Sequence, residues 1–164
     1  MLLSKINLDI IILNFIKKMI FDDVILINIF ENGICITQNI NNISNLSIFI
    51  EKKHLNNHFL HTEHSFVTSD ILNLANLEIK KENNKYVVNN QINVVNDVCN
   101  VCKKLINLKF PKNEIAYEKL NIDPKLSFLK DNKFDVLISK QFNGIVLKTT
   151  INEFTLFINL LYSP

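Results

Sequence analysis

Apolar residues recur at the spacing of one helical face in Asn14-Phe15-Ile16-Lys17-Lys18-Met19-Ile20. The two lysines fall on the opposite side, so residues 10–20 are predicted to form an amphipathic helix that packs on a sheet. A β-branched run at 24–30 follows and ends at Asn32-Gly33. This dipeptide is a strong signal for a tight hairpin, because such a turn needs positive φ. A second strand is predicted at 34–38.

The same pattern returns in Asn100-Val101-Cys102-Lys103-Lys104-Leu105-Ile106. Residues 97–107 are therefore predicted to form a second helix, capped by Asp97, with its apolar stripe in the same phase. A hairpin over 134–149 follows, with its turn at Asn143-Gly144, and the chain has no glycine outside these two turns. Repeats of this kind mark tandem units. The two helices are therefore expected to pack equivalent faces on equivalent sheets.

The remaining segments are predicted to be mostly strands, which makes the expected fold class α+β. A short helix is predicted at 70–76, after a strand at 66–67. Residues 52–64 are polar and are predicted to form a connector. The other predicted strands are 4–8, 46–50, 77–81, 85–88, 115–117 and 154–161.

The composition favours a folded intracellular protein. The chain has 164 residues, 48% of them hydrophobic, which is enough for the core of one domain or two small lobes. Its formal charge of +2 does not indicate nucleic-acid binding, so only a local basic surface could do so. Its three cysteines do not make a disulfide framework, and no apolar run approaches the length of a membrane span. No catalytic triad, P-loop or glycine-rich phosphate cradle is visible, so neither catalytic residues nor a cofactor are expected.

Two clusters could hold a metal ion, although we expect no metal site. Cys99 and Cys102 form a CxxC pair that could be a zinc half-site or a redox pair, but their helical spacing favours core packing for Cys102. Four histidines in the connector could also bind zinc. Side chains on an extended strand alternate between faces, however, which favours a solvated connector. These histidines are His54, His58, His61 and His64.

The predicted order of elements resembles the DNA sliding clamps of the proliferating cell nuclear antigen (PCNA) family. The segment that carries the resemblance is Gly33-Ile34-Cys35-Ile36-Thr37-Gln38-Asn39-Ile40-Asn41-Asn42-Ile43-Ser44-Asn45-Leu46. The family also shows a strand that leads into a second helix. The segment that resembles it here is Phe66-Val67-Thr68-Ser69-Asp70-Ile71-Leu72. The resemblance implies clamp-like tandem lobes, residues 1–92 and a shortened lobe at 93–164, with the boundary in the Asn-rich segment 89–93.

The resemblance also implies a function. Clamp helices face duplex DNA with basic side chains, so Lys17, Lys18, Lys103 and Lys104 are the expected DNA-binding residues. The implied protein is a non-enzymatic DNA polymerase processivity factor that binds duplex DNA without sequence specificity. Its expected partners are a DNA polymerase or other replication proteins and, in a homo-oligomer, further copies of itself.

An alternative is a clamp-derived protein–protein interaction module that has lost DNA binding. A third and weaker hypothesis is a zinc- or thiol-dependent regulator. In the first two cases the protein is expected to be soluble, without a membrane partner, and to work in the nucleus or at another site of DNA replication.

Overall fold

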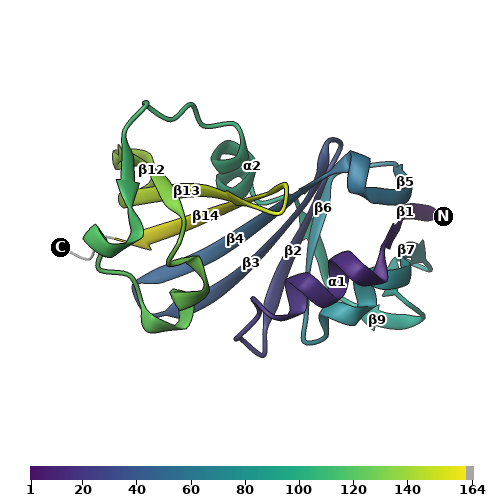
Figure 1. Cartoon of the computed structure of the whole chain (residues 1–164). Coiled ribbons are helices and arrows are strands. Elements are labelled where there is room, and N and C mark those ends of the chain that lie inside the picture. The colour runs from purple at the N-terminus through teal and green to yellow at the C-terminus, as the bar shows by residue number, and fades with distance from the viewer. Residues whose placement is uncertain (162–164) are drawn as a thin grey trace.

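The computed structural model describes residues 1–161 as a mixed α+β fold built on two antiparallel sheets (Figure 1), which confirms the predicted fold class. The smaller sheet has the strand order β5 (Leu55–Leu60), β1 (Leu2–Leu8), β7 (Leu77–Glu82), β8 (Lys85–Val88) and β9 (Gln91–Asn93). The larger has the order β10 (Val95–Asp97), β6 (His64–Thr68), β2 (Ile25–Phe30), β3 (Gly33–Asn41), β4 (Ser44–Glu51), β14 (Phe154–Leu161), β13 (Gly144–Ile151), β12 (Lys133–Ser139) and β11 (Glu114–Ala116).

The helices are short. The two α-helices are α1 (Ile10–Lys17) and α2 (Asn100–Ile106). Five 3-10 helices complete the described elements: η1 (Lys52–His54), η2 (Ile71–Asn76), η3 (Tyr117–Lys119), η4 (Pro124–Leu129) and η5 (Lys140–Phe142). The predicted helix at 70–76 is thus a 3-10 helix.

Two predicted boundaries are wrong. The connector predicted at 52–64 contains β5, which pairs with β1. β5 is an edge strand, and most of its residues are polar or exposed because one side of it faces solvent. Asp97 does not cap α2; it ends β10, which pairs with β6, and Cys99 is the N-cap residue.

The turns show which residues take positive φ. Gly33, the first residue of β3, has φ of +154°. The turn between β12 and β13 is different, because η5 fills it and Asn143 takes the left-handed conformation while Gly144 does not. Asn83 and Asn84, with φ of 50° and 63°, close the predicted hairpin of β7 and β8. Asparagine tolerates this region better than most residues, which accounts for its use in these turns.

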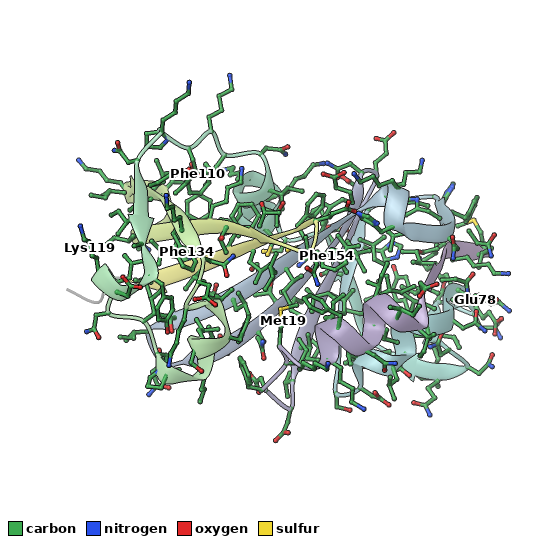
Figure 2. All side chains as sticks on the ribbon, viewed as in Figure 1. Met19, Glu78, Phe110, Lys119, Phe134 and Phe154 are labelled. Atoms are coloured by element: carbon green, nitrogen blue, oxygen red, sulfur yellow. The ribbon has the colours of Figure 1, made fainter. Side chains whose placement is uncertain are left out.

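The two faces of the nine-stranded sheet carry separate clusters of side chains. Alternate residues of its central strands, such as Ile27, Ile36 and Ile48, belong to the main core. This core face also packs against α1, through Leu13 and Ile16, and against η4. Phe134 and Phe154, labelled in Figure 2, belong to the same cluster.

The opposite face of the nine-stranded sheet packs against α2, and we call it the α2 face. Cys35 and Phe49, which are cross-strand partners, contact the cluster that contains Cys102. Further along the sheet, Leu105 of α2 packs with Val146 and Phe157. The prediction that the two helices pack equivalently is therefore wrong, because α1 and α2 lie on opposite faces of one sheet.

The structure repeats a different unit. A 3-10 helix capped by an aspartate side chain, followed by a three-stranded antiparallel meander, occurs as η2-β7-β8-β9 and again as η4-β12-β13-β14. Asp70 accepts a hydrogen bond from Leu72 N in the first copy, and Asp123 accepts one from Lys125 N in the second, both at 2.9 Å. The first strand of each meander pairs on its other side with an earlier strand, β1 or β11.

The last strand joins the two parts of the chain. As predicted, β14 enters a sheet, and it does so within the chain, between β4 and β13 (Figure 1). Leu156 lies opposite Ile48 of β4 and Thr149 of β13. The nine-stranded sheet is consequently continuous from β10 to β11.

Candidate functional surfaces

The first pair of predicted DNA-binding lysines lies at the end of α1. Asp9 caps the start of this helix by accepting a hydrogen bond from Ile11 N at 2.8 Å. Leu13 and Ile16 are buried against the core, so Lys17 and Lys18 point away from it and are exposed. Neither lysine forms an ion pair within residues 1–161.

Gln38, which sequence reasoning did not single out as functional, fixes the end of α1. Its buried side chain donates to Met19 O and accepts hydrogen bonds from the backbone N–H of Phe21 and Asp22, at 2.8 and 3.1 Å. These bonds satisfy backbone groups beyond the last turn of the helix. The signal in the sequence was a polar residue at a core-facing position of a strand.

The segment that follows α1 contacts the later part of the chain on the same face. The rings of Phe21 and Phe128 lie 6.2 Å apart between centroids. Lys125 of η4 donates from Nζ to Ile40 O at 2.8 Å, and Asn41 Nδ2 donates to Asp123 Oδ2 at 2.9 Å. These bonds join the end of β3 to the start of η4.

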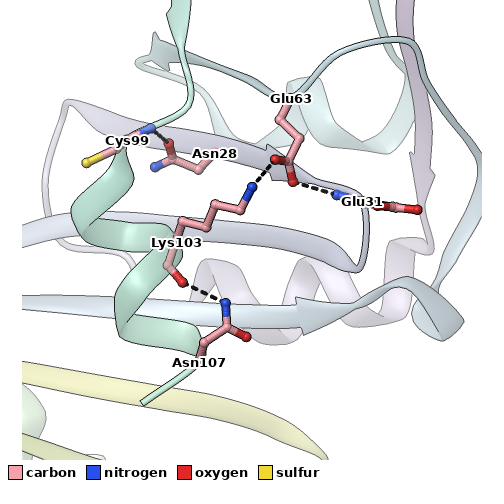
Figure 3. A network of polar contacts seen from close by, with 6 residues as sticks. All are labelled: Asn28, Glu31, Glu63, Cys99, Lys103 and Asn107. Carbon is pink, nitrogen blue, oxygen red and sulfur yellow. Dashed lines mark hydrogen bonds and ion pairs between the residues drawn. The ribbon is translucent and has the colours of Figure 1, made fainter.

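The second pair of predicted DNA-binding lysines lies on α2, and a polar network anchors this helix (Figure 3). Lys103 Nζ forms an ion pair with Glu63, which also accepts a hydrogen bond from Glu31 N at 3.1 Å. Asn28, a buried residue of β2, accepts a hydrogen bond from Cys99 N at 3.0 Å. The ion pair of Lys103 therefore helps to hold α2 in place. Lys104 is exposed and forms no ion pair within the described chain.

The pKa of Glu63 reflects this network. Partial burial acts to raise the pKa, but hydrogen bonds from Lys103 and Glu31 N, together with the charge of Lys103, outweigh it and leave the pKa lowered. Because the pair is partly exposed, it contributes little to the free energy of unfolding. Its main effect is to position α2.

The four predicted DNA-binding lysines do not form one surface. Lys17 and Lys18 lie at the core face of the nine-stranded sheet, where α1 packs, and Lys103 and Lys104 lie at the α2 face. The similar sequence patterns of the two helices hid this difference, because helical periodicity defines which side of a helix is buried and not which face of a sheet buries it.

An open cleft of about 690 Å³ lies beside α2. Its apolar lining comes from Phe30, Phe49 and Ile106, at the ends of β2 and β4 and in α2. Charged residues of both signs surround it, among them the Lys103–Glu63 pair. Clefts that combine an apolar floor with a few polar groups are typical of binding sites.

All three cysteines lie in one region under α2. Cys102 is buried and Cys99 is partly exposed at the start of the same helix, as predicted, and buried Cys35 joins them from β3. Burial raises the pKa of Cys35 to about 12 and also raises that of Cys102. Both buried thiols are therefore protonated at neutral pH, which suits core packing.

The connector histidines are dispersed by the strands. His58 of β5 makes a hydrogen bond of 3.2 Å to Phe30 O, and His54 lies 3.5 Å from Glu153. His64, in β6, is buried. Within residues 1–161, no three His, Cys, Asp or Glu side chains are grouped so that they could hold a metal ion.

His64 is expected to make the stability of the protein depend on pH. Burial lowers its pKa below the ordinary value of 6.5, so the native state resists a proton that the unfolded chain accepts. The free energy of unfolding should therefore fall as the pH drops below about 6.5. We expect His64→Leu to remove much of this loss between about pH 6.5 and 5, measured by urea unfolding across that range.

The control for this prediction is His61→Leu, the same substitution at an exposed position. It should keep the pH profile of the wild type. Carboxylates with lowered pKa, such as Glu63, release their stabilising interactions only at lower pH. An unchanged profile in a folded His64→Leu protein would contradict the role given to His64.

Comparison with known proteins shows the fold. No family of known sequences matches the chain, and no curated protein does. A solved structure titled as the C-terminal region of FEN-1 bound to A. fulgidus PCNA aligns with 99% of this chain and 99% of that chain, at 8% identity and a TM-score of 0.50. The beta chain of DNA polymerase III from Streptococcus pneumoniae TIGR4 aligns with 100% of this chain and 66% of its own, at 13% identity and a TM-score of 0.47.

The protein therefore has the fold of the PCNA-like sliding clamps, as its sequence predicted. None of the helices among residues 1–161 has the length and apolar character needed to cross a membrane.

Proposed function

We propose that the protein is a non-enzymatic, clamp-like accessory factor that holds a DNA polymerase or another replication protein on duplex DNA. The observation that carries this proposal is the sliding-clamp fold, in which α1 presents Lys17 and Lys18 at an exposed end. Lysines without an ion pair are available to contact phosphates, and such contacts hold DNA without reading its sequence. The PCNA structure that supports the fold is bound to the C-terminal region of FEN-1, which supports a protein partner of this kind.

Only one of the two lysine pairs can contact a duplex that lies against α1. A straight duplex that lies against α1 cannot also reach α2, because the nine-stranded sheet separates the two helices. Lys103 is in addition paired with Glu63. We therefore assign duplex contact to Lys17 and Lys18 and leave Lys103 and Lys104 out of it.

A salt titration of duplex binding tests the assignment. Lys17→Ala combined with Lys18→Ala removes two phosphate contacts, so the slope of log K against log salt should fall by about two units, one per contact. Duplexes of different sequence should be affected alike. Because both side chains are exposed, melting should change little.

The matched control is Lys104→Ala combined with Lys109→Ala, which removes the same charge from exposed positions in and after α2. This variant should keep the slope and most of the affinity. Equal losses in both variants would show that the effect comes from net charge and not from α1. No change in the α1 variant would remove the DNA contact from the proposal.

A second candidate function is a protein–protein interaction module without DNA binding. The cleft beside α2 favours it, because Phe49 and Ile106 offer an apolar floor to a partner's side chain. Absence of duplex binding by the wild-type protein, at low salt and in a folded sample, would favour this candidate over the first.

A further inference from the structure

The thiols of Cys99 and Cys102 lie within one turn at the start of α2. Lys103 N donates to Cys99 O at 3.0 Å and closes this turn, and Cys99, the N-cap residue, has an extended backbone. Side chains three residues apart lie on the same face of a helix. Burial is the main cause of the raised pKa of Cys102, and the neighbouring thiols of Cys35 and Cys99 add to it. The sulfur atoms of Cys99 and Cys102 are therefore close neighbours.

The three thiols differ in their access to solvent. Cys99 is partly exposed, whereas Cys102 and Cys35 are 7% and 0% exposed. Cys99 packs at the margin of the apolar cluster that contains the two buried thiols. A dissolved oxidant therefore meets Cys99 first, with Cys102 next to it inside the cluster. An accessible thiol beside a second one is the usual arrangement of a reversible oxidation site.

Asn28 brings a buried amide nitrogen without a partner to the same place. Its Oδ1 accepts a hydrogen bond from Cys99 N at 3.0 Å, which holds the amide beside Cys99 (Figure 3). The side chain of Asn28 is fully buried, and its Nδ2 has no hydrogen-bond partner among residues 1–161. Buried donors are normally satisfied, so an unpaired one needs an explanation. An oxygen atom attached to the Cys99 sulfur would supply the missing acceptor.

We propose that Cys99 is a site of reversible oxidation by hydroperoxides and that Cys102 converts the oxidised thiol into a disulfide. In the first step the Cys99 thiolate attacks the peroxide. Its O–O bond breaks, an S–O bond forms, and the other oxygen takes a proton from solvent and leaves as water or an alcohol. The product is a sulfenic acid, so the sulfur is oxidised by the two electrons that reduce the peroxide.

The second step joins the two sulfur atoms. The Cys102 sulfur attacks the Cys99 sulfur, the S–O bond breaks, and the oxygen leaves as water with the proton of the Cys102 thiol. Because burial raises the pKa of Cys102, this thiol is protonated at neutral pH and reacts slowly. The sulfenic acid therefore accumulates before the disulfide forms. Asn28 Nδ2 donates a hydrogen bond to its oxygen and holds it beside α2.

The disulfide changes the start of α2. Residues three apart on a helix have Cβ atoms about 5–6 Å apart, whereas a disulfide needs about 3.5–4.5 Å. The first turn must therefore tighten, which the extended backbone of Cys99 permits. Lys103 follows Cys102 and, with Ile106, lines the cleft beside α2. Oxidation is thus coupled to the shape of this cleft, and the inference does not depend on DNA binding.

Peptide mapping of the whole chain after treatment with hydrogen peroxide tests the proposal. The reduced, folded protein is oxidised, its free thiols are alkylated, and it is digested with trypsin. Cys99 and Cys102 lie in one peptide, 86–103, and Cys35 lies in another, 19–52. The first peptide should lose a pair of hydrogen atoms and escape alkylation, and dithiothreitol should reverse both changes. Peptide 19–52 should stay reduced unless the protein is first unfolded in urea.

Two matched variants separate the steps. Cys102→Ala should abolish the disulfide and leave Cys99 as a sulfenic acid, which dimedone labels in larger amount than in the wild type. Cys35→Ala, which removes the other buried thiol, should keep the disulfide. Circular dichroism shows whether each variant is folded, and the map of the wild type decides the proposal if one is not.

Nuclear magnetic resonance tests the role of Asn28 directly. When Cys99 is oxidised in Cys102→Ala, the Nδ2 protons of Asn28 should shift downfield and exchange more slowly, because they gain an acceptor. An unchanged signal would contradict this role. A disulfide between peptides 19–52 and 86–103, equal oxidation of Cys35 and Cys99 in the folded wild type, or no disulfide in peptide 86–103 would overturn the proposal.

Discussion

Gly33→Ala is expected to lower the free energy of unfolding by about 3 kcal/mol or more, as the sum of backbone strain and overpacking. The φ of Gly33 is +154°, where residues with a side chain are strained. A Cβ atom at this position would lie 2.1 Å from Ile50 O, a backbone atom of the neighbouring strand β4. The β3–β4 ladder would have to shift to accept it. Urea unfolding followed by circular dichroism measures the loss.

Gly144→Ala is the control, since Gly144 begins the equivalent strand of the second hairpin but does not have positive φ. We expect a change of less than about 1 kcal/mol there, in either direction. If both variants lost the same stability, the requirement for glycine at position 33 would not come from its φ and its contact with Ile50.

Leu156→Ala is expected to cost about 2–5 kcal/mol, the range for deleting a fully buried leucine side chain. Leu156 lies in β14, is buried in the main core and faces Ile48 of β4. Because β14 connects strands from both parts of the chain, the loss should be felt throughout the nine-stranded sheet. The protein should still unfold in one transition, at a lower denaturant concentration.

Two probes can separate local from global effects of this substitution. Circular dichroism follows the sheets as a whole, and alkylation of buried Cys35 follows the opening of β3, four strands from β12 in the sheet order. Both should shift together in Leu156→Ala. Leu72→Ala, at a partly exposed position of η2, should shift neither by much. An unchanged alkylation rate in Leu156→Ala would mean that the two parts of the chain unfold independently.

The main helices and strands could be predicted from the sequence. The apolar stripe with Ile16 and Met19 defined the buried side of the first helical segment, and Cys102 and Leu105 did the same for α2. The hairpin at Asn32-Gly33 and the final strand at 154–161 were also predicted correctly, because turn residues and alternation act over a few positions. Together these elements were enough to identify the sliding-clamp fold.

The arrangement of the candidate site was decided by tertiary structure. Lys17 and Lys103 occupy matching places in two similar helical patterns, yet α1 and α2 pack on opposite faces of the same sheet. Helical periodicity is a local property, whereas the face that a helix covers depends on where the preceding strand pairs, here β10 beside β6. The pairing of Lys103 with Glu63 likewise joins residues distant in sequence, so only the folded chain could reveal it.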